Sequence, residues 1–484
     1  MKKSAMYYIH IAIFLLITFG IGFLPPFAQI TELGMRVLGV FLGIIYGWLF
    51  VGLDWPSLIA LCALAAIGYG EGADSLFLVG WAFMTIPPMI LSFILAEGLA
   101  QTKLTDYIAN KLLSIKLFAG KPFALMTGIL VAQMLMALTQ SQYASLFLLW
   151  SLAATIADKA GYPKKNIFTT TIVTSTVAVF VWSSFVFPFA PGTLAQIAFF
   201  KQGLPDAEIP FFGWIITWLI FTLAYCFIWP LITKYILRLD FSPVSNIDLS
   251  DLLKSGAKMR LNKEQKFGII VLVGFMIAMF VPKLLPAEWI LTQTLNRLGL
   301  TGCLAIAVSV MAAYKKDDGT PFLTLQNAAK AISWNVIWLL VATQPIAAAF
   351  NAQECGIMPS LMTVITPILT TLSPNVFMLI CILVLGLVTQ FVHNMVLMVV
   401  FYPILCPLYL QMGGNPFVMF LGLLIGMNAA FATPAASWNS AMMFGVDGAI
   451  KSKLYTQGII HFFLSVLLFF LIGLPLANIF LPFN

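Results

Sequence analysis

The chain has 484 residues, of which 61% are hydrophobic and only 9% are charged, and its mean hydropathy is +0.99. Soluble domains carry about 25% charged residues, so this composition excludes an ordinary soluble protein and indicates an integral membrane protein. The net charge of +7 does not indicate a nucleic-acid partner, because the distribution of Lys and Arg described below explains it by membrane topology.

Apolar runs of helix-spanning length recur along the chain; about 20 such residues suffice to cross a bilayer. The runs do not alternate between apolar and polar residues, as the strands of a transmembrane barrel do. The run after Lys2 and Lys3 lacks an Ala-x-Ala cleavage site, so we expect a first span there and not a signal peptide. The sequence predicts an all-α, multi-pass protein with about eleven spans, at residues 8–24, 35–52, 56–71, 77–99, 168–200, 212–236, 267–285, 298–314, 331–351, 416–444 and 457–481.

Two polar interruptions, residues 139–143 and 389–395, lie at matching places in the two halves. Polar groups at membrane depth persist where they line a cavity or meet protein partners, because lipid cannot satisfy them. Apolar runs flank each interruption, which predicts two re-entrant helical hairpins, at 118–157 and 358–411. Paired interruptions in corresponding halves point to the binding site of a transporter.

The positions of Lys and Arg support the re-entrant interpretation. Every Lys and Arg except Arg36, Lys201, Lys283 and Arg297 falls on one predicted side, as expected for cytoplasmic loops. Making either hairpin a single span would invert everything after it and spoil this distribution. We therefore expect a protein of the cytoplasmic (inner) membrane, with its N-terminus inside and its C-terminus outside. Its longest polar connection, 237–266, has the composition of a cytoplasmic linker.

A span interrupted by small residues, Pro and Thr follows each hairpin. The interruptions are 187–193 in the first half and 431–437 in the second. Proline removes a backbone donor and clashes with the preceding turn, so we expect both helices to be broken near the middle of the membrane. Half-helix N-termini favour anions and unwound carbonyl groups favour cations. With inverted repeats, the two tips and two breaks predict one central site.

This layout resembles the divalent anion/sodium symporter family over nearly the whole chain. The stretch 332–340, which contains two Trp residues, and the stretch 78–113 are similar to the corresponding family segments. The resemblance implies an inverted-repeat, elevator-type transporter that is a homodimer in the lipid bilayer and carries a small anion, such as a dicarboxylate, with sodium. It also implies a scaffold formed by residues 1–117 and 267–351 and a transport domain formed by 118–236 and 352–484.

The family's hairpin tips carry Ser-Asn-Thr, and its breaks carry Thr-Pro-Pro-Asn-like turns. In this chain the tips carry Gln142 and Tyr143 after the Ser, and His393 and Met395 around the Asn, and the second turn keeps Thr-Pro and, further on, Asn439. Tyr143 and Met395 fill space, and each replaces the small aliphatic hydroxyl of a Thr at its tip. The resemblance predicts sodium sites at Ser141, Gln142 and Asn394, mainly through backbone carbonyls. It predicts substrate contacts by Ser141, Gln142, Tyr143, Thr193, His393, Asn394 and Thr433.

The sequence is compatible with several alternative functions. His393 titrates near neutral pH when unperturbed, so it would allow proton coupling in place of sodium. An uncoupled anion exchanger would use the same architecture. A channel would need a filter repeated by symmetry, which the two unlike tips do not offer. An intramembrane enzyme needs activated groups such as a Gly-x-Ser-x-Gly motif or paired aspartates within the spans, and the sequence has neither, so we expect no enzyme and no cofactor besides sodium.

Overall fold

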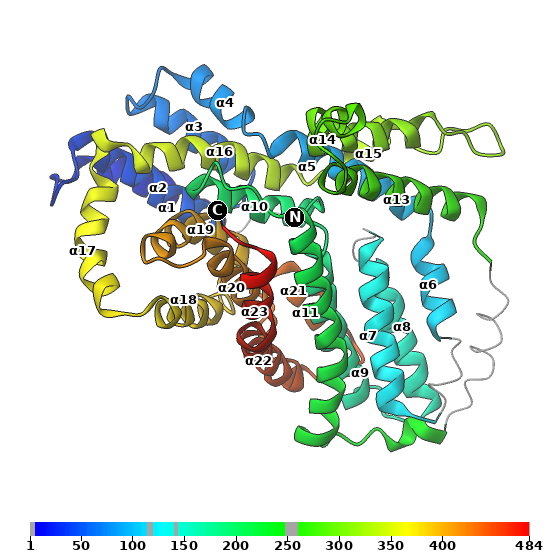
Figure 1. Cartoon of the computed structure of the whole chain (residues 1–484). Coiled ribbons are helices and arrows are strands. Elements are labelled where there is room, and N and C mark those ends of the chain that lie inside the picture. Colours follow the sequence, from blue (N-terminus) through cyan, green and yellow to red (C-terminus); the bar gives the residue numbers. More distant parts are fainter. Residues whose placement is uncertain (1–4, 114–119, 140–143, 247–259, 484) are drawn as a thin grey trace.

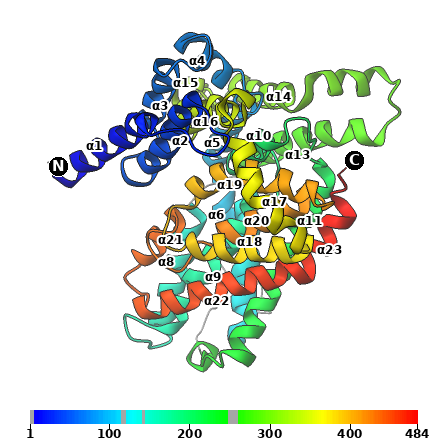
Figure 2. The same ribbon diagram turned by 90° about the vertical axis from the view of Figure 1, so that its left-hand side faces the viewer.

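The computed structural model describes residues 5–113, 120–139, 144–246 and 260–483. These residues form helices and connecting segments, with no β-sheet among them. Figures 1 and 2 show that the helices divide into an upper and a lower layer. The all-α membrane fold that the sequence predicts is therefore confirmed.

The upper layer contains helices from the start of the chain and from its middle. Close packing within it depends on small residues, as is usual between membrane helices. Gly43 lies against Thr18, and Gly47 lies against Phe14, so a side chain at either glycine would collide with α1. The helices of the upper layer are α1 (Ala5–Gly20), α2 (Glu32–Phe50), α3 (Trp55–Ala66), α4 (Ala73–Trp81), α5 (Ile86–Gln101), α13 (Lys263–Leu284), α14 (Ile290–Ala313), α15 (Leu325–Ala328) and α16 (Trp334–Asn351).

The lower layer contains α6 (Leu104–Leu113), the two hairpins and the helices that follow each hairpin. Besides α6 it comprises α7 (Pro122–Leu138), α8 (Ala144–Lys159), α9 (Ile167–Ser184), α10 (Pro191–Gly203), α11 (Phe211–Leu231), α18 (Pro374–Val388), α19 (Asn394–Gln411), α20 (Pro416–Asn428), α21 (Trp438–Phe444), α22 (Lys451–Leu468) and α23 (Leu474–Phe480).

The lower layer is built from two similar units. Each unit has a helical hairpin, then a broken helix, then a long helix that ends in a π-helical turn. In the first unit α9 packs against both arms of the hairpin α7–α8, and α11 ends in the turn Ile232–Ile236. In the second unit α20 packs against both arms of α18–α19, and α22 ends in the turn Phe469–Gly473. The repeat predicted from the polar interruptions is therefore present in the structure.

The predicted hairpin at 358–411 needs a correction. This stretch contains a third helix, α17 (Ile357–Thr371), which runs between the upper and lower layers in Figure 1. Pro374 begins the next helix, and a proline there lacks the donor needed to continue the preceding helix. Within this stretch the helical hairpin is therefore formed by α18 and α19 alone.

Eight of the described helices are long and apolar enough to cross a membrane, or ten if each of two bent pairs is one span. The predicted span 77–99 is one such pair, with α4 and α5 bent by 52° where Pro87 restarts the helix. The segment α15 to α16 is bent by 73°. The predicted spans at 56–71 and 416–444 contain only shorter helices, and α19, predicted as a hairpin arm, is itself of spanning length. Multiple apolar helices of this length make the chain a multi-pass membrane protein.

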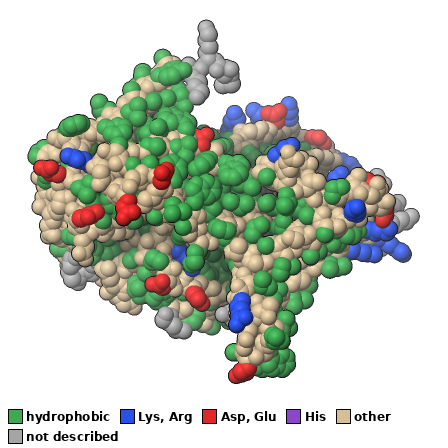
Figure 3. Space-filling view, turned by 90° about the horizontal axis from the view of Figure 1, so that it is seen from above, with side chains coloured by type: hydrophobic (Ala, Val, Ile, Leu, Met, Phe, Trp, Pro, Cys, Tyr) green, Lys and Arg blue, Asp and Glu red, His purple; other side chains and the backbone are tan. Residues whose placement is uncertain are grey.

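Hydrophobic side chains cover much of the face seen in Figure 3. In this view Asp and Glu gather mainly on the left half and Lys and Arg mainly on the right half. Large apolar side chains on the upper layer that are exposed include Leu16, Phe50 and Ile277. Exposed apolar surface of this kind suits a lipid environment.

Candidate functional site

The second broken helix is held open by one buried glutamine. Gln390, at the end of the first hairpin arm, donates from Nε2 to the carbonyl of Ala429 at 2.9 Å. Its Oε1 accepts from the backbone amides of Phe431 at 3.2 Å and Ala432 at 2.9 Å. The hydroxyl of Thr433 donates back to the Gln390 carbonyl. These bonds satisfy backbone groups that the break between α20 and α21 leaves without helical partners.

Serine side chains bind further carbonyls of this break. Ser437 donates to the carbonyl of Ala430 at 3.0 Å and accepts from the amide of Ser440 at 3.2 Å, so it caps α21. Ser440 donates to the carbonyl of Thr433 at 2.6 Å. The unwound segment is therefore a fixed conformation with specific partners.

The tip of the second hairpin is joined to this segment. Asn394 begins α19, and its backbone N–H donates to the carbonyl of Ala436 at 3.3 Å. Its Nδ2 lies 3.3 Å from Oδ1 of Asn428, the last residue of α20. His393 accepts from the amide of Met395 through Nδ1, while its Nε2 has no hydrogen-bond partner within the described residues. The tip and the break thus form one polar cluster.

In the first broken helix the break comprises residues 185–190, between α9 and α10. Trp214 donates from its indole nitrogen to the carbonyl of Phe185 at 2.7 Å, and Ser92 of α5 donates to the carbonyl of Phe189. The hydroxyl of Thr193 donates to the carbonyl of Ser184 at 3.1 Å. Both breaks overlap the predicted interruptions: residues 185–190 overlap the predicted 187–193, and residues 429–437 include the predicted 431–437.

A cavity of about 530 Å³ lies between the two breaks and the upper layer. We call it the central cavity. It is lined by Leu53, Phe93, Ala137, Phe180, Val181, Ser184, Phe185, Ala190, Pro191, Gly192, Ala195, Gln196, Ser333, Asn335, Val336, Asn394, Met395, Asn428, Ser437, Trp438, Asn439, Ala441 and Met442.

Several helices begin at the central cavity. Lining residues come from the first turn of α10 (Pro191), of α19 (Asn394), of α16 (Asn335) and of the short α21 (Asn439). A helix N-terminus carries about half a positive charge and has unsatisfied amide groups. None of the described residues that line the cavity is Lys, Arg, Asp or Glu. Backbone dipoles are therefore the main source of electrostatic potential from these residues. The N-termini favour an anion, whereas the last turns of α9 (Ser184) and α20 (Asn428), which also line the cavity, favour a cation.

The predicted site residues have different outcomes. Asn394 lines the central cavity. Thr193 and Thr433 do not line it, and their hydroxyls donate to backbone carbonyls of the breaks. His393 does not line it either, and its ring packs edge-on to Trp438 at 5.6 Å. The residues Ser141, Gln142 and Tyr143 lie outside the described residues.

The structure adds three carboxamides to the site that the sequence prediction omitted. Gln196 lies one helical turn after Thr193 on α10, is only 3% exposed and has an Oε1 without a partner among the described residues. Asn428 is the last residue before the second break, and Asn439 follows that break. Asn439 is predicted from the sequence as part of the second turn and not as a site residue. The signal for Gln196 is a polar side chain in the first turns of a half-helix.

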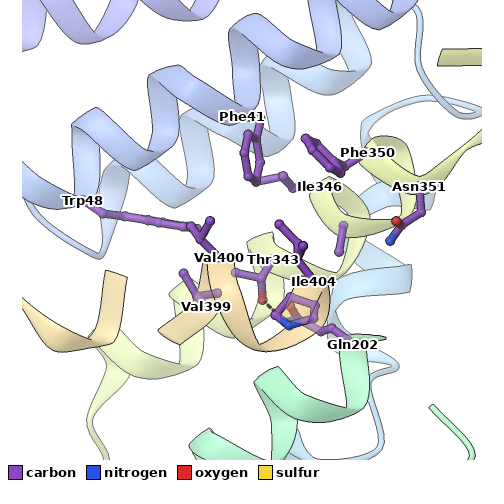
Figure 4. Close-up of a pocket in the computed structure, with 12 residues that line it drawn as sticks. Phe41, Trp48, Gln202, Thr343, Ile346, Phe350, Asn351, Val399, Val400 and Ile404 are labelled. Atoms are coloured by element: carbon purple, nitrogen blue, oxygen red, sulfur yellow. Dashed lines mark hydrogen bonds between the residues drawn. The ribbon is translucent and has the colours of Figure 1, made fainter. Parts of the chain in front are cut away.

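A second, much smaller cavity of about 30 Å³ lies between the upper and lower layers (Figure 4). Phe41 and Phe350 line it from the upper layer and Val399 from α19, so its walls are mainly apolar. One hydrogen bond crosses it, from Nε2 of Gln202 on α10 to the hydroxyl of Thr343 on α16, at 2.6 Å. This bond links a broken helix of the lower layer directly to the upper layer.

Comparisons with known proteins find similarity to transporters. No family model matches the chain. A segment of 148 residues is 24% identical to Na(+)/dicarboxylate cotransporter 3 of Homo sapiens, covering 31% of this chain and only 24% of that protein's length. The fold is similar to the crystal structure of the Alcanivorax borkumensis YdaH transporter, described as having an unusual topology, with a TM-score of 0.59 and 16% identity over 88% of this chain and 97% of that one. Together these findings confirm the resemblance to the divalent anion/sodium symporter family that the sequence predicts.

Proposed function

We propose that the protein is a secondary active transporter that carries a small anion across the cytoplasmic membrane, coupled to sodium. The observation that carries this proposal is the convergence of half-helix N-termini on one cavity without charged side chains among its described residues. Such N-termini attract anions. A site between two broken helices of inverted repeats is typical of secondary transporters. The similarity to a sodium/dicarboxylate cotransporter and to a transporter fold supports the same function.

The breaks are chemically suited to a coupling cation. Carbonyl oxygens of the second break, such as those of Ala430 and Thr433, each accept a hydrogen bond from a serine. A carbonyl oxygen has two lone pairs, so each retains capacity for a cation that prefers oxygen ligands. Sodium held there would place a positive charge beside the anion and strengthen its binding. We propose the backbone of this break and Asn394 as sodium ligands.

The two layers would have different roles in transport. We propose that the upper layer is a scaffold that forms a homodimer and that the lower layer carries the anion between the two membrane faces. The hydrogen bond between Gln202 and Thr343 would then hold the layers in one of at least two positions. We also propose that the N-terminus lies in the cytoplasm, as the distribution of Lys and Arg predicts.

A proton-coupled transporter and an uncoupled exchanger are the competing functions. His393 is the titratable residue of the second tip through which proton coupling would act. Its Nδ1 accepts a hydrogen bond from the backbone amide of Met395, so Nε2 carries the hydrogen of the neutral ring and has no acceptor among the described residues. The three functions differ in what stabilises the folded protein. A ligand that binds only the folded state at 100 times its dissociation constant adds about 2.7 kcal/mol of stability.

The test is thermal unfolding of the purified protein in sodium, lithium and choline salts at several pH values, with and without small anions. Sodium-coupled transport predicts a shift in the midpoint with an anion that is larger in sodium than in choline. An equal shift in all salts that follows pH and is lost in His393→Ala would replace sodium by proton coupling. An equal shift at every pH would favour the exchanger, and no shift with any anion would contradict the proposal as a whole.

A further inference from the structure

Most of the residues that line the central cavity are apolar. Phe93 of α5 and Val336 of α16 line it from the upper layer, and Phe185, Met395 and Met442 line it from the lower layer. Small inorganic anions and short dicarboxylates have little apolar surface to bury against such walls. Burial of apolar surface contributes about 25 cal/mol per Å², so these walls favour a ligand with an apolar body.

The polar side chains of the cavity are neutral, and several are carboxamides. Gln196 is almost fully buried, its Oε1 has no partner among the described residues, and its Nε2 donates to the sulfur of Met395 at 3.8 Å. Oδ1 of Asn439 also lacks a partner among the described residues. Buried polar groups are normally hydrogen-bonded, so these two side chains have hydrogen-bonding capacity for a ligand in the cavity. Rotation of a carboxamide by 180° exchanges its oxygen for its NH₂ group, so both can donate to a carboxylate.

The charge of the cavity limits the charge of its ligand. Each helix N-terminus contributes about half a positive charge, and α10, α16 and α19 are long helices that begin there. The C-termini of α9 and α20 also reach the cavity and offset part of this charge, and the sodium proposed above would add one positive charge. The resulting potential suits a single negative charge. A second carboxylate would need to lie against the apolar walls, where an unpaired charge is costly.

The volume of the cavity agrees with this limit. At about 530 Å³ it falls within the range of roughly 300–1,000 Å³ typical of pockets that enclose drug-sized organic ligands. A four-carbon dicarboxylate would leave much of this space to water.

We propose that the transported anion is an organic monocarboxylate with an apolar body. Its carboxylate accepts hydrogen bonds from the carboxamides of Gln196 and Asn439 and from the helix N-termini. Its apolar part packs against Phe93, Trp438 and Met442. This inference rests on the proposed function, because it names the substrate class of the same cavity.

The experiment measures dissociation constants by ligand-induced thermal stabilisation in a sodium buffer. The probes are the linear monocarboxylates from acetate to hexanoate, together with succinate and sulfate, and the uncharged alcohols of equal length control for partition into detergent. Each added methylene should tighten binding by about fourfold if it enters an apolar cavity. The alcohols should show a weaker effect at every length, because they lack the charge.

Two variants test the assigned roles. Gln196→Leu and Asn439→Ala should each weaken hexanoate binding by about tenfold, since each removes a hydrogen-bond donor to a charged group. The matched control is Gln411→Leu, which makes the same change at an exposed position at the end of α19 and should leave binding unchanged. If Gln196→Leu fails to fold, Asn439→Ala still decides the point.

The outcomes separate the two proposals. Tighter binding of succinate or sulfate than of hexanoate, without a methylene increment, would overturn the monocarboxylate assignment and leave the transporter proposal intact. Unchanged hexanoate binding in both variants would also overturn it. Stabilisation by no anion at all would contradict the proposed function itself.

Discussion

Gln390 shows how a single side chain can maintain an unwound helix at membrane depth. It pairs with one carbonyl and two amides of the second break. In Gln390→Leu these three backbone groups lose their partners, and each buried unsatisfied group costs about 1–3 kcal/mol. We expect a loss of stability on the order of 3 kcal/mol or more, measured by thermal or denaturant unfolding. Gln411→Leu, exposed to solvent, is the control, and equal stability of the two variants would contradict this role.

The roles of individual residues were predicted from the sequence with mixed success. Asn394 was predicted because it lies at the hairpin tip that resembles the family motif, and it lines the cavity. Thr193 and Thr433 were predicted from their places at the breaks, but their hydroxyls bind nearby carbonyls. A hydroxyl has one donor, and the sequence does not show whether a backbone carbonyl or a ligand will accept it. Gln196 was missed because its burial depends on how α10 packs against distant helices.

Close packing of α22 against the second break is a feature of whole elements. A Cβ atom at Gly458 would lie 2.5 Å from the carbonyl oxygen of Phe431 and 2.7 Å from Cα of Ala432. Both are backbone atoms, so Gly458→Ala forces the break to move. We expect lower thermal stability and weaker anion binding in this variant. Affinity and stability equal to those of the unmodified protein would show that the position of the break is not critical.

The matched control is Gly274→Ala on α13. A Cβ there meets open space, and replacing a helical glycine by alanine favours the helix by about 1 kcal/mol. This variant should therefore unfold at the same temperature as the unmodified protein or slightly higher, with unchanged binding.

Elements were predicted more reliably than residues because their patterns are local. Apolar runs gave most of the spans, and prolines with small residues gave both breaks. The prediction was wrong where one apolar stretch holds several helices, as at 358–411, because hydropathy does not reveal a bend. The turn before Pro374 and the bend before Pro87 both occur at prolines, which are the local feature that marks them.

At the scale of the whole molecule, transport by movement of the lower layer makes a direct prediction. The double variant Gln202→Cys and Thr343→Cys replaces two side chains that are hydrogen-bonded across the layers. A short bifunctional thiol reagent should therefore link the two positions. The link should abolish transport, and release by a reductant should restore it. The control is the double variant Thr174→Cys and Gln457→Cys within the lower layer, where the Thr174 hydroxyl lies 2.7 Å from Oε1 of Gln457. Its link should leave transport intact. Transport that continues through the first link would contradict movement between the layers.

The central claim is that the cavity between the broken helices carries an anion across the membrane. The most direct measurement is uptake of a labelled anion, chosen as the one that most stabilises the purified protein, into proteoliposomes with and without an inward sodium gradient. Unmodified protein should accumulate the anion above its external concentration only with the gradient, and Asn439→Ala should lower the initial rate at subsaturating anion about tenfold. Uptake that never exceeds that of protein-free liposomes, or that is unaffected by Asn439→Ala, would contradict the account.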